Sequence, residues 1–196
     1  MRVVVVHAPV AATGPDHDAY AAAVTAARDA GHDVSAIDLR AEAFVPVMSP
    51  AEREAYHGTA PLITHETRRH ADLVTAAEAF VFVYPSTFTT VPALLRGWLE
   101  RVFVPGVAFV FDERTNKVRP GLTSVRRIIG VATYDDSRWS VLRERDNGRR
   151  VLLRALRLNT GIRTRTGWIA LHGAPTATNA DRAAFVARVE RRMGRL

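Results

Sequence analysis

The stretch FVFVYPSTFTTVPALLRGWLERVFVPGVAFVF, which runs from Phe80 to Phe111, has the pattern of a strand, a loop and a helix in succession. It begins with an unbroken apolar run, which is typical of a strand buried on both faces of a parallel sheet. A helix is predicted from Pro92 to Phe103. The loop between them is rich in hydroxyl groups and contains an aromatic residue, Phe88. Because open α/β sheets bind ligands at the carboxyl ends of their strands, we expect this loop to contact a ligand.

Strands and helices alternate along the rest of the chain. Further apolar runs predict strands at residues 3–6, 33–39, 127–133 and 165–171, besides the strand at 80–84. Helices are expected at residues 18–30, 50–57, 63–77, 148–158 and 179–193. This order predicts an α/β protein with a flavodoxin-like, doubly wound, five-stranded parallel sheet that carries helices on both faces. The sequence has no internal repeat or linker, so residues 1–196 are expected to form a single flavodoxin-like domain.

Composition narrows the classes of function. The chain has no cysteine, which excludes disulfides, thiolate metal sites, iron–sulfur clusters and cysteine nucleophiles. There is also no GxSxG elbow and no P-loop, so serine hydrolases and P-loop NTPases have no support. The start, MRVVVVHAP, is too short in its apolar run for a signal peptide, and no later run approaches a membrane helix in length. We expect a soluble, cytoplasmic protein without a membrane partner.

The net charge of +7 is distributed unevenly. Residues 1–137 hold 13 Lys and Arg against 16 Asp and Glu, whereas residues 138–196 hold 14 against 4. A solvated arginine-rich surface is the simpler interpretation, and a surface that attracts anions is the alternative. The basic segment has no zinc-finger spacing, no persuasive helix-turn-helix and only scattered aromatic residues. No nucleic-acid partner is therefore expected.

Three loops, at residues 7–18, 85–92 and 133–140, follow expected strands and should converge on one edge of the sheet. Their hydroxyl groups, free amides and aromatic rings suit a flat, anionic ligand that forms hydrogen bonds. The residues that offer these groups are Thr13, Gly14, Ser86, Thr87, Phe88, Thr89, Thr90, Thr133 and Tyr134. Such residues are also common in ordinary turns, so composition alone leaves both interpretations open.

Several longer motifs occur in a fixed order. The first strand ends in His7, DLR begins at Asp38, a PAERE segment is followed by Tyr56, and FVFVYP, VPALLRGWLERVF and PGVAF come next. In this order the chain resembles the NAD(P)H:quinone oxidoreductase family of flavodoxin-like flavoproteins over nearly its whole length, most strongly from Pro85 to Phe111. The resemblance implies a homodimer that binds FMN, with FAD as a close alternative. It further implies reduction by NAD(P)H and two-electron reduction of a quinone or a similar flat aromatic acceptor.

The resemblance also implies roles for individual positions. His7 and the loop containing Thr13, Gly14 and Asp16 would face the flavin phosphate and ribityl chain. The isoalloxazine ring would be lined by Pro85, Ser86, Thr87, Phe88 and Thr89, and its pyrimidine end would lie near Thr133, Tyr134 and Asp136. Phe109 and Phe111 would cross the dimer interface and cap the partner's substrate pocket.

Some loop residues depart from the family pattern. Thr87, Phe88 and Thr89 stand where the family usually has one or two tryptophans, although Phe88 keeps an aromatic face for stacking. Asp135 and Asp136 replace small residues that let the backbone approach the ring. Two alternatives follow: a repurposed member that acts on a specialised aromatic metabolite, and a flavin-free binding or regulatory protein on the same dimeric scaffold.

The first loop is unusual for a phosphate site, because Pro9 and Pro15 lack amide donors and Asp16 and Asp18 add negative charge. A carboxylate beside the phosphate would repel it by roughly 3–4 kcal/mol, more than the roughly 0.3–1 kcal/mol gained from a helix dipole. We therefore expect Asp16 or Asp18 to be the N-cap of the first helix and to point away from the phosphate. The amides of residues 10–14 would then hold it.

Tyr134, Asp135 and His172 are the candidate catalytic residues, because each could handle a proton near the ligand, and Arg138 could bind an anion. His172 is more simply explained as an ordinary loop histidine. His65 and His70, beside Glu66, lack the spacing of a zinc helix and are expected on a solvated helix face. No metal is expected.

Overall fold

The computed structural model describes residues 1–56, 61–112 and 117–196. Its central sheet has five parallel strands: β1 (Arg2–His7), β2 (Asp33–Asp38), β3 (Ala79–Pro85), β6 (Arg127–Tyr134) and β7 (Arg165–His172). They lie in the order β2-β1-β3-β6-β7. This is the strand order of a flavodoxin-like sheet. The predicted fold class and all five predicted strands are confirmed.

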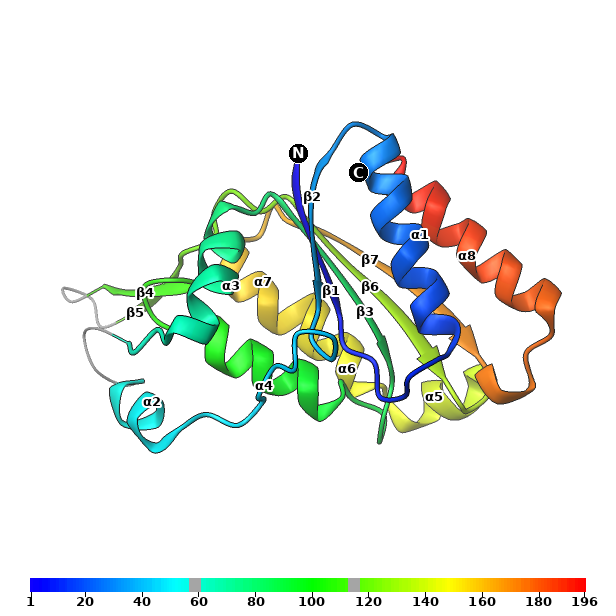
Figure 1. Cartoon of the computed structure of the whole chain (residues 1–196), viewed down its shortest axis with the longest axis horizontal. Coiled ribbons are helices and arrows are strands. Elements are labelled where there is room, and N and C mark those ends of the chain that lie inside the picture. The colour runs from blue at the N-terminus through cyan, green and yellow to red at the C-terminus, as the bar shows by residue number, and fades with distance from the viewer. Residues whose placement is uncertain (57–60, 113–116) are drawn as a thin grey trace.

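Helices cover both faces of the sheet (Figure 1). One face carries α1 (Pro15–Asp29) and α8 (Asn179–Met193), which lie against each other. The other face carries α3 (His65–Ala76) and α4 (Ala93–Val102). Alternate residues of each strand point to opposite layers, so that Val3 and Val5 pack in one core and Val4 and Val6 in the other. Since both sets are buried, the strands read as continuous apolar runs.

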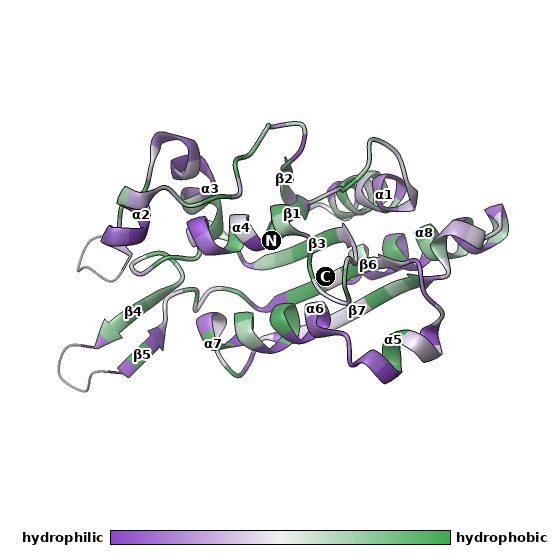
Figure 2. Ribbon diagram, turned by 90° about the horizontal axis from the view of Figure 1, so that it is seen from below, coloured by the Kyte–Doolittle hydropathy of each residue, from purple (hydrophilic) through white to green (hydrophobic). Residues whose placement is uncertain are grey.

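The helix predicted at residues 148–158 is irregular. It consists of α6 (Asn147–Arg150), the π-helical turn η1 (Val151–Ala155) and α7 (Leu156–Thr160), which we call together the α6–α7 segment. It packs on the face that carries α3 and α4, where η1 contacts β6 and Arg149 lies over the Trp168 ring of β7 (Figure 2). The short helix α5 (Arg138–Glu144), which the sequence patterns missed, precedes it and is capped by the Ser137 side chain.

Smaller elements lie outside the two layers. Helix α2 (Pro50–Ala55) begins with a capping box between Ser49 and Glu52, and His57, included in the predicted helix, falls outside the described residues. A turn of 3-10 helix, η2 (Ala174–Thr176), follows β7. The antiparallel hairpin of β4 (Phe109–Asp112) and β5 (Lys117–Pro120) was not predicted and extends away from the sheet (Figure 2).

One histidine prediction is wrong. His65 is exposed as expected, but His70 is buried and joins α3 to α4. Its Nδ1 accepts a hydrogen bond of 3.1 Å from the indole N–H of Trp98, and its Nε2 lies 2.8 Å from a Glu42 oxygen. His70 belongs to the core because both ring nitrogens have partners there.

Within the described residues, no helix combines the length and apolar character that a membrane crossing requires.

Candidate functional site

Backbone hydrogen bonds join the loops at the carboxyl edge of the sheet. The amide of Ser86, after β3, donates to the Thr133 carbonyl near the end of β6 over 2.8 Å. The amide of Gly173, after β7, donates to the Asp136 carbonyl over 3.0 Å. The amide of Ala8, after β1, donates to the Val83 carbonyl over 3.0 Å. The three loops that the sequence places at one edge therefore meet there.

His7 lies at the centre of the first loop and is completely buried. Its Nδ1 is 2.9 Å from an Asp38 oxygen and its Nε2 is 3.0 Å from an Asp16 oxygen, while its ring stacks on Tyr20 at 4.6 Å. Burial acts to raise the pKa of Asp38, but hydrogen bonds from the Ala41 amide and from His7 outweigh burial and hold this pKa below its usual value. The imidazole is thus fixed between two carboxylates.

The expected capping role of Asp16 or Asp18 is wrong. Helix α1 begins at Pro15, three residues earlier than predicted, and its N-cap is Gly14, which has no capping side chain. The Asp16 carboxylate instead turns inward to His7 and is buried, and Asp18 is exposed. One oxygen of Asp16 is therefore paired with the imidazole, and the other lies beside Gly14 of the loop.

The first loop has the donors that a phosphate requires. In the described part of the chain, the amides of residues 10–14 take part in no backbone hydrogen bond. The carbonyls of Val10 and Ala11 accept from Arg40 Nη1 at 2.7 Å and from His17 Nε2 at 3.3 Å, which holds the loop in place. Free amides at a helix N-terminus, with a guanidinium beside them, fit the phosphate of a flavin nucleotide. Thr13 is exposed on this loop.

The same region offers ligand atoms for a metal. One potential ligand atom from each of His7, Asp16 and His17 lies within 4.8 Å of the others. Both ring nitrogens of His7 already have carboxylate partners, in Asp16 and Asp38. His17 Nε2 bonds to the Ala11 carbonyl, and the His17 ring meets the His7 ring edge to face at 4.7 Å, so each of the three side chains has a partner within the protein.

The loop after β3 ends in a strained two-residue turn. The amide of Thr87 donates to the Thr90 carbonyl at 3.1 Å, and the amide of Thr90 donates back at 2.9 Å. The two residues between them, Phe88 and Thr89, have φ values of 48° and 52°. A left-handed conformation costs a side-chain-bearing residue roughly 1–2 kcal/mol. The turn holds the Phe88 ring fully exposed at the carboxyl edge, at 101% relative accessibility.

Tyr134 and His172, two of the three candidate catalytic residues, contact each other where β6 and β7 end. The Tyr134 hydroxyl donates to the Asp146 carboxylate, and its ring stacks on His172 with centroids 4.8 Å apart. Burial, reinforced by the Asp146 charge, raises the pKa of Tyr134 far above its usual value. Burial, reinforced by Arg138 and Arg188, lowers the pKa of His172. Asp135 is exposed, as is Asp136.

A cavity of about 530 Å³ adjoins Tyr134 and His172 and lies between β7 and the segment from α5 to α7. We call it the arginine groove, because six arginines line it: Arg138, Arg145, Arg149, Arg150, Arg154 and Arg157. Only Arg138 was singled out from the sequence. The available signals were the basic C-terminal third and the regular spacing of Arg150, Arg154 and Arg157.

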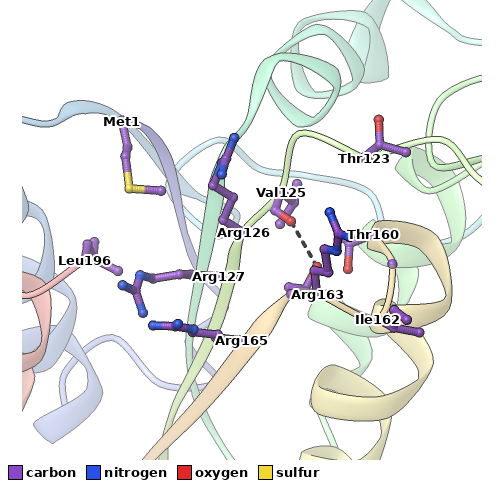
Figure 3. Close-up of a pocket in the computed structure, with 12 residues that line it drawn as sticks. Met1, Thr123, Val125, Arg126, Arg127, Thr160, Ile162, Arg163, Arg165 and Leu196 are labelled. Carbon is purple, nitrogen blue, oxygen red and sulfur yellow. Dashed lines mark hydrogen bonds between the residues drawn. The ribbon is translucent and has the colours of Figure 1, made fainter.

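A second cavity, of about 640 Å³, lies at the opposite edge of the sheet, where β6 and β7 begin. Arg126, Arg127, Arg163 and Arg165 line it, and Arg127 and Arg165 extend in the same direction (Figure 3). The predicted ligand-binding loops contribute no residue to this cavity.

Phe109 and Phe111 lie on the hairpin, apart from the loops at the carboxyl edge (Figure 1). Their rings meet edge to face with centroids 5.7 Å apart, and Phe111 remains half-exposed. Neither ring is placed to contact the site of its own chain.

A doubly wound sheet with an amide-lined loop after β1 and an exposed aromatic turn after β3 defines a protein of the flavodoxin type. The sequence profile of the family described as flavodoxin-like fold matches residues 1–193. The chain belongs to this family.

Curated proteins similar to the chain include NAD(P)H dehydrogenases [quinone]. An NAD(P)H dehydrogenase [quinone] 1 from Cavia porcellus is 32% identical over 111 residues, which are 49% of this chain and 40% of that protein. The chain thus spans less than half the length of this curated relative.

Solved structures resemble it over nearly their whole length. An NAD(P)H:quinone oxidoreductase from Methanothermobacter marburgensis has a TM-score of 0.83 at 17% identity and covers 99% of this chain and 98% of its own. An FMN-dependent NADH-azoreductase from Bacillus anthracis str. Ames Ancestor, in complex with FMN, has a TM-score of 0.76 at 14% identity and covers 98% of both chains. These likenesses show a common fold.

Proposed function

We propose that the protein is a flavin-dependent NAD(P)H oxidoreductase that transfers two electrons to quinones or similar flat conjugated acceptors. The observation that carries the proposal is the presence, at one edge of the sheet, of a loop whose amides have no backbone partner among the described residues and of a fully exposed aromatic turn. The first suits a phosphate and the second a flat ring. The quinone dehydrogenase from Cavia porcellus and the FMN-dependent azoreductase support this assignment.

FMN, with FAD as the alternative, would be held by three groups of residues. The amides of residues 10–14 would bind the phosphate, with Arg40 beside them. Residues 85–89 would line the ring, and Thr133 to Asp136 would lie at its pyrimidine end. When bound, the flavin supplies the hydride transfer from NAD(P)H to the acceptor.

The chain's own residues would position the reactants and handle the proton that accompanies hydride transfer to a quinone. Tyr134 stays protonated at neutral pH, and its hydroxyl is already bonded to Asp146, so it is better suited to orient His172 than to release a proton. The lowered pKa of His172 keeps this ring neutral. Asp135 is exposed at the same edge and has access to solvent protons.

The functional unit would be a homodimer of single-domain subunits. Phe109 and Phe111 project on a hairpin away from their own site, which suits a role in closing the partner's pocket. Such a site would bind the acceptor against residues from both chains.

The experiment begins with the visible absorbance of the purified protein, followed by titration with FMN and with FAD. We expect a yellow protein, or one that binds either flavin stoichiometrically. Anaerobic addition of NADPH or NADH should bleach the flavin absorbance, and a simple quinone should restore it. A colourless protein that binds neither flavin would refute the assignment.

A further inference from the structure

The positive charge of the arginine groove is not balanced by the carboxylate that lines it. Six arginines line it against one carboxylate, that of Asp146. Asp146 is already occupied, because its oxygens accept from the Tyr134 hydroxyl and from the Arg149 amide. Across residues 1–56, 61–112 and 117–196, none of the six guanidinium groups forms an ion pair. The groove therefore offers donors to an anion from outside the chain.

Three of these arginines form a row along the α6–α7 segment. Arg150, Arg154 and Arg157 follow one another at intervals of four and three residues and all line the cavity. Like charges at this spacing destabilise a helix. The Arg157 guanidinium donates from Nη2 to the Ile162 carbonyl at 2.8 Å, and its buried Nε has no partner among the described residues. The row extends over roughly 10 Å along the helix, which leaves room for more than one phosphate group.

The groove is elongated and begins at the candidate flavin site. One end is the stacked pair of Tyr134 and His172 at the carboxyl edge, and the lining continues along β7 to Thr166. Six residues of strand extend over roughly 20 Å. Trp168 lies between the two ends, with the Arg149 guanidinium 5.9 Å from the centre of its ring. An aromatic surface within a row of cations suits a nucleotide with separated phosphate groups.

We propose that the arginine groove binds the 2′-phosphorylated adenosine half of NADPH, and that it thereby selects NADPH over NADH as the electron donor. This assignment rests on the proposed function, because it names the donor for that site. The 2′-phosphate is the group that distinguishes the two donors, and guanidinium groups bind phosphate through paired hydrogen bonds. Trp168 provides a surface for adenine, and the nicotinamide end extends towards Tyr134 and His172.

Calorimetric titration of the purified full-length protein with adenosine 2′,5′-bisphosphate and with adenosine 5′-monophosphate tests the assignment without any turnover. We expect the bisphosphate to bind at least about tenfold more tightly, since a charge-assisted hydrogen bond supplies that factor or more. Arg154→Gln should remove most of this difference, and Arg154→Lys should restore part of it. In steady-state assays, Arg154→Gln should raise KM for NADPH at least about tenfold and leave KM for NADH nearly unchanged.

Arg163→Gln is the matched control, because Arg163 is an exposed arginine in the cavity at the opposite edge. Equal affinity for the two nucleotides, or the same loss in the control as in Arg154→Gln, would overturn the assignment. Flavin binding is measured separately by absorbance. If the protein binds no flavin but binds the bisphosphate through Arg154, the oxidoreductase proposal fails and with it the role of the groove in donor choice, while its affinity for a 2′-phosphorylated adenosine stands. If a flavin-loaded protein is reduced equally well by both donors, the groove assignment alone fails.

Discussion

At the scale of single residues, the carboxylate of Asp38 has the clearest consequence for stability. It faces the buried Nδ1 of His7 and accepts from the amides of Arg40 and Ala41. Asp38→Ala removes these bonds, and we expect the free energy of unfolding at pH 7 to fall by about 1–3 kcal/mol. Chemical denaturation measures the change. Asp33→Ala, at the exposed start of the same strand, is the control and should have little effect.

The free energy of unfolding that Asp38→Ala removes should depend on pH in one direction. The folded-state pKa of Asp38 is depressed, so its contribution is complete above the unfolded-state pKa of about 3.9 and disappears as pH falls through the lower folded value. The difference between wild type and Asp38→Ala should therefore be constant near neutral pH and shrink below about pH 4. A difference of the same size at pH 3 and at pH 7 would contradict the role assigned to the ionised carboxylate.

Thr89 tests whether the exposed turn is strained. Its φ of 52° is unfavourable for a β-branched residue and acceptable for glycine. We expect Thr89→Gly to raise the free energy of unfolding by about 0.5–1 kcal/mol, measured by urea denaturation. Thr90→Gly, next to it and without a positive φ, should be neutral or destabilising because glycine gains entropy in the unfolded chain. If both variants shift stability in the same direction by similar amounts, strain at Thr89 is not the cause.

At the scale of secondary-structure elements, the absence of a side chain at Gly130 in β6 leaves room for the Trp168 ring of β7. A Cβ at this position would lie 2.1 Å from the Trp168 ring. Gly130→Ala should destabilise the protein by about 1–3 kcal/mol through overpacking, as measured by thermal unfolding. Adding Trp168→Leu should recover part of this loss, because the smaller side chain leaves room for the methyl group. Additive losses in the double variant would show that the two side chains do not compete for space.

The elements differ in how far the sequence could predict them. The five strands are predictable because helices cover both faces, so that every side chain from Val3 to Val6 is apolar. The hairpin of β4 and β5 is not, because each strand has only four residues and most of their side chains are exposed. Helix α5 has only seven residues, with charged residues at both ends.

The sequence predicts which loops form the candidate site, but it does not predict the contacts between their side chains. The loops meet at one edge because the strands are parallel, as topology requires. The pairing of Asp16 with His7 depends on α1 beginning at Pro15, three residues before the predicted start. The surplus of arginine in the C-terminal third was visible in the sequence. Its concentration beside β7 depends on how the α6–α7 segment packs, which no local pattern encodes.

At the scale of the whole molecule, the hairpin is where a second subunit would dock. It extends from the body of the chain and exposes apolar side chains on both strands: Val110, Phe111 and Val118. Exposed apolar side chains gathered on a projecting element are typical of a surface that another chain covers. A homodimer in which each hairpin reaches the partner's site would combine Phe88 of one subunit with Phe111 of the other.

This arrangement predicts complementation between two defective subunits. Phe88→Ala and Phe111→Ala should each lower quinone reduction while leaving the far-UV circular dichroism spectrum unchanged, because both side chains are exposed or half-exposed. If subunits are mixed at equal concentration and allowed to exchange, half of the dimers are mixed, and each of these has one site with both phenylalanines. Activity should then recover to about a quarter of the wild-type value, as two-fold symmetry requires. Each variant mixed with itself is the control. A mixture no more active than its two components would place both side chains in the same subunit's site and refute the shared pocket.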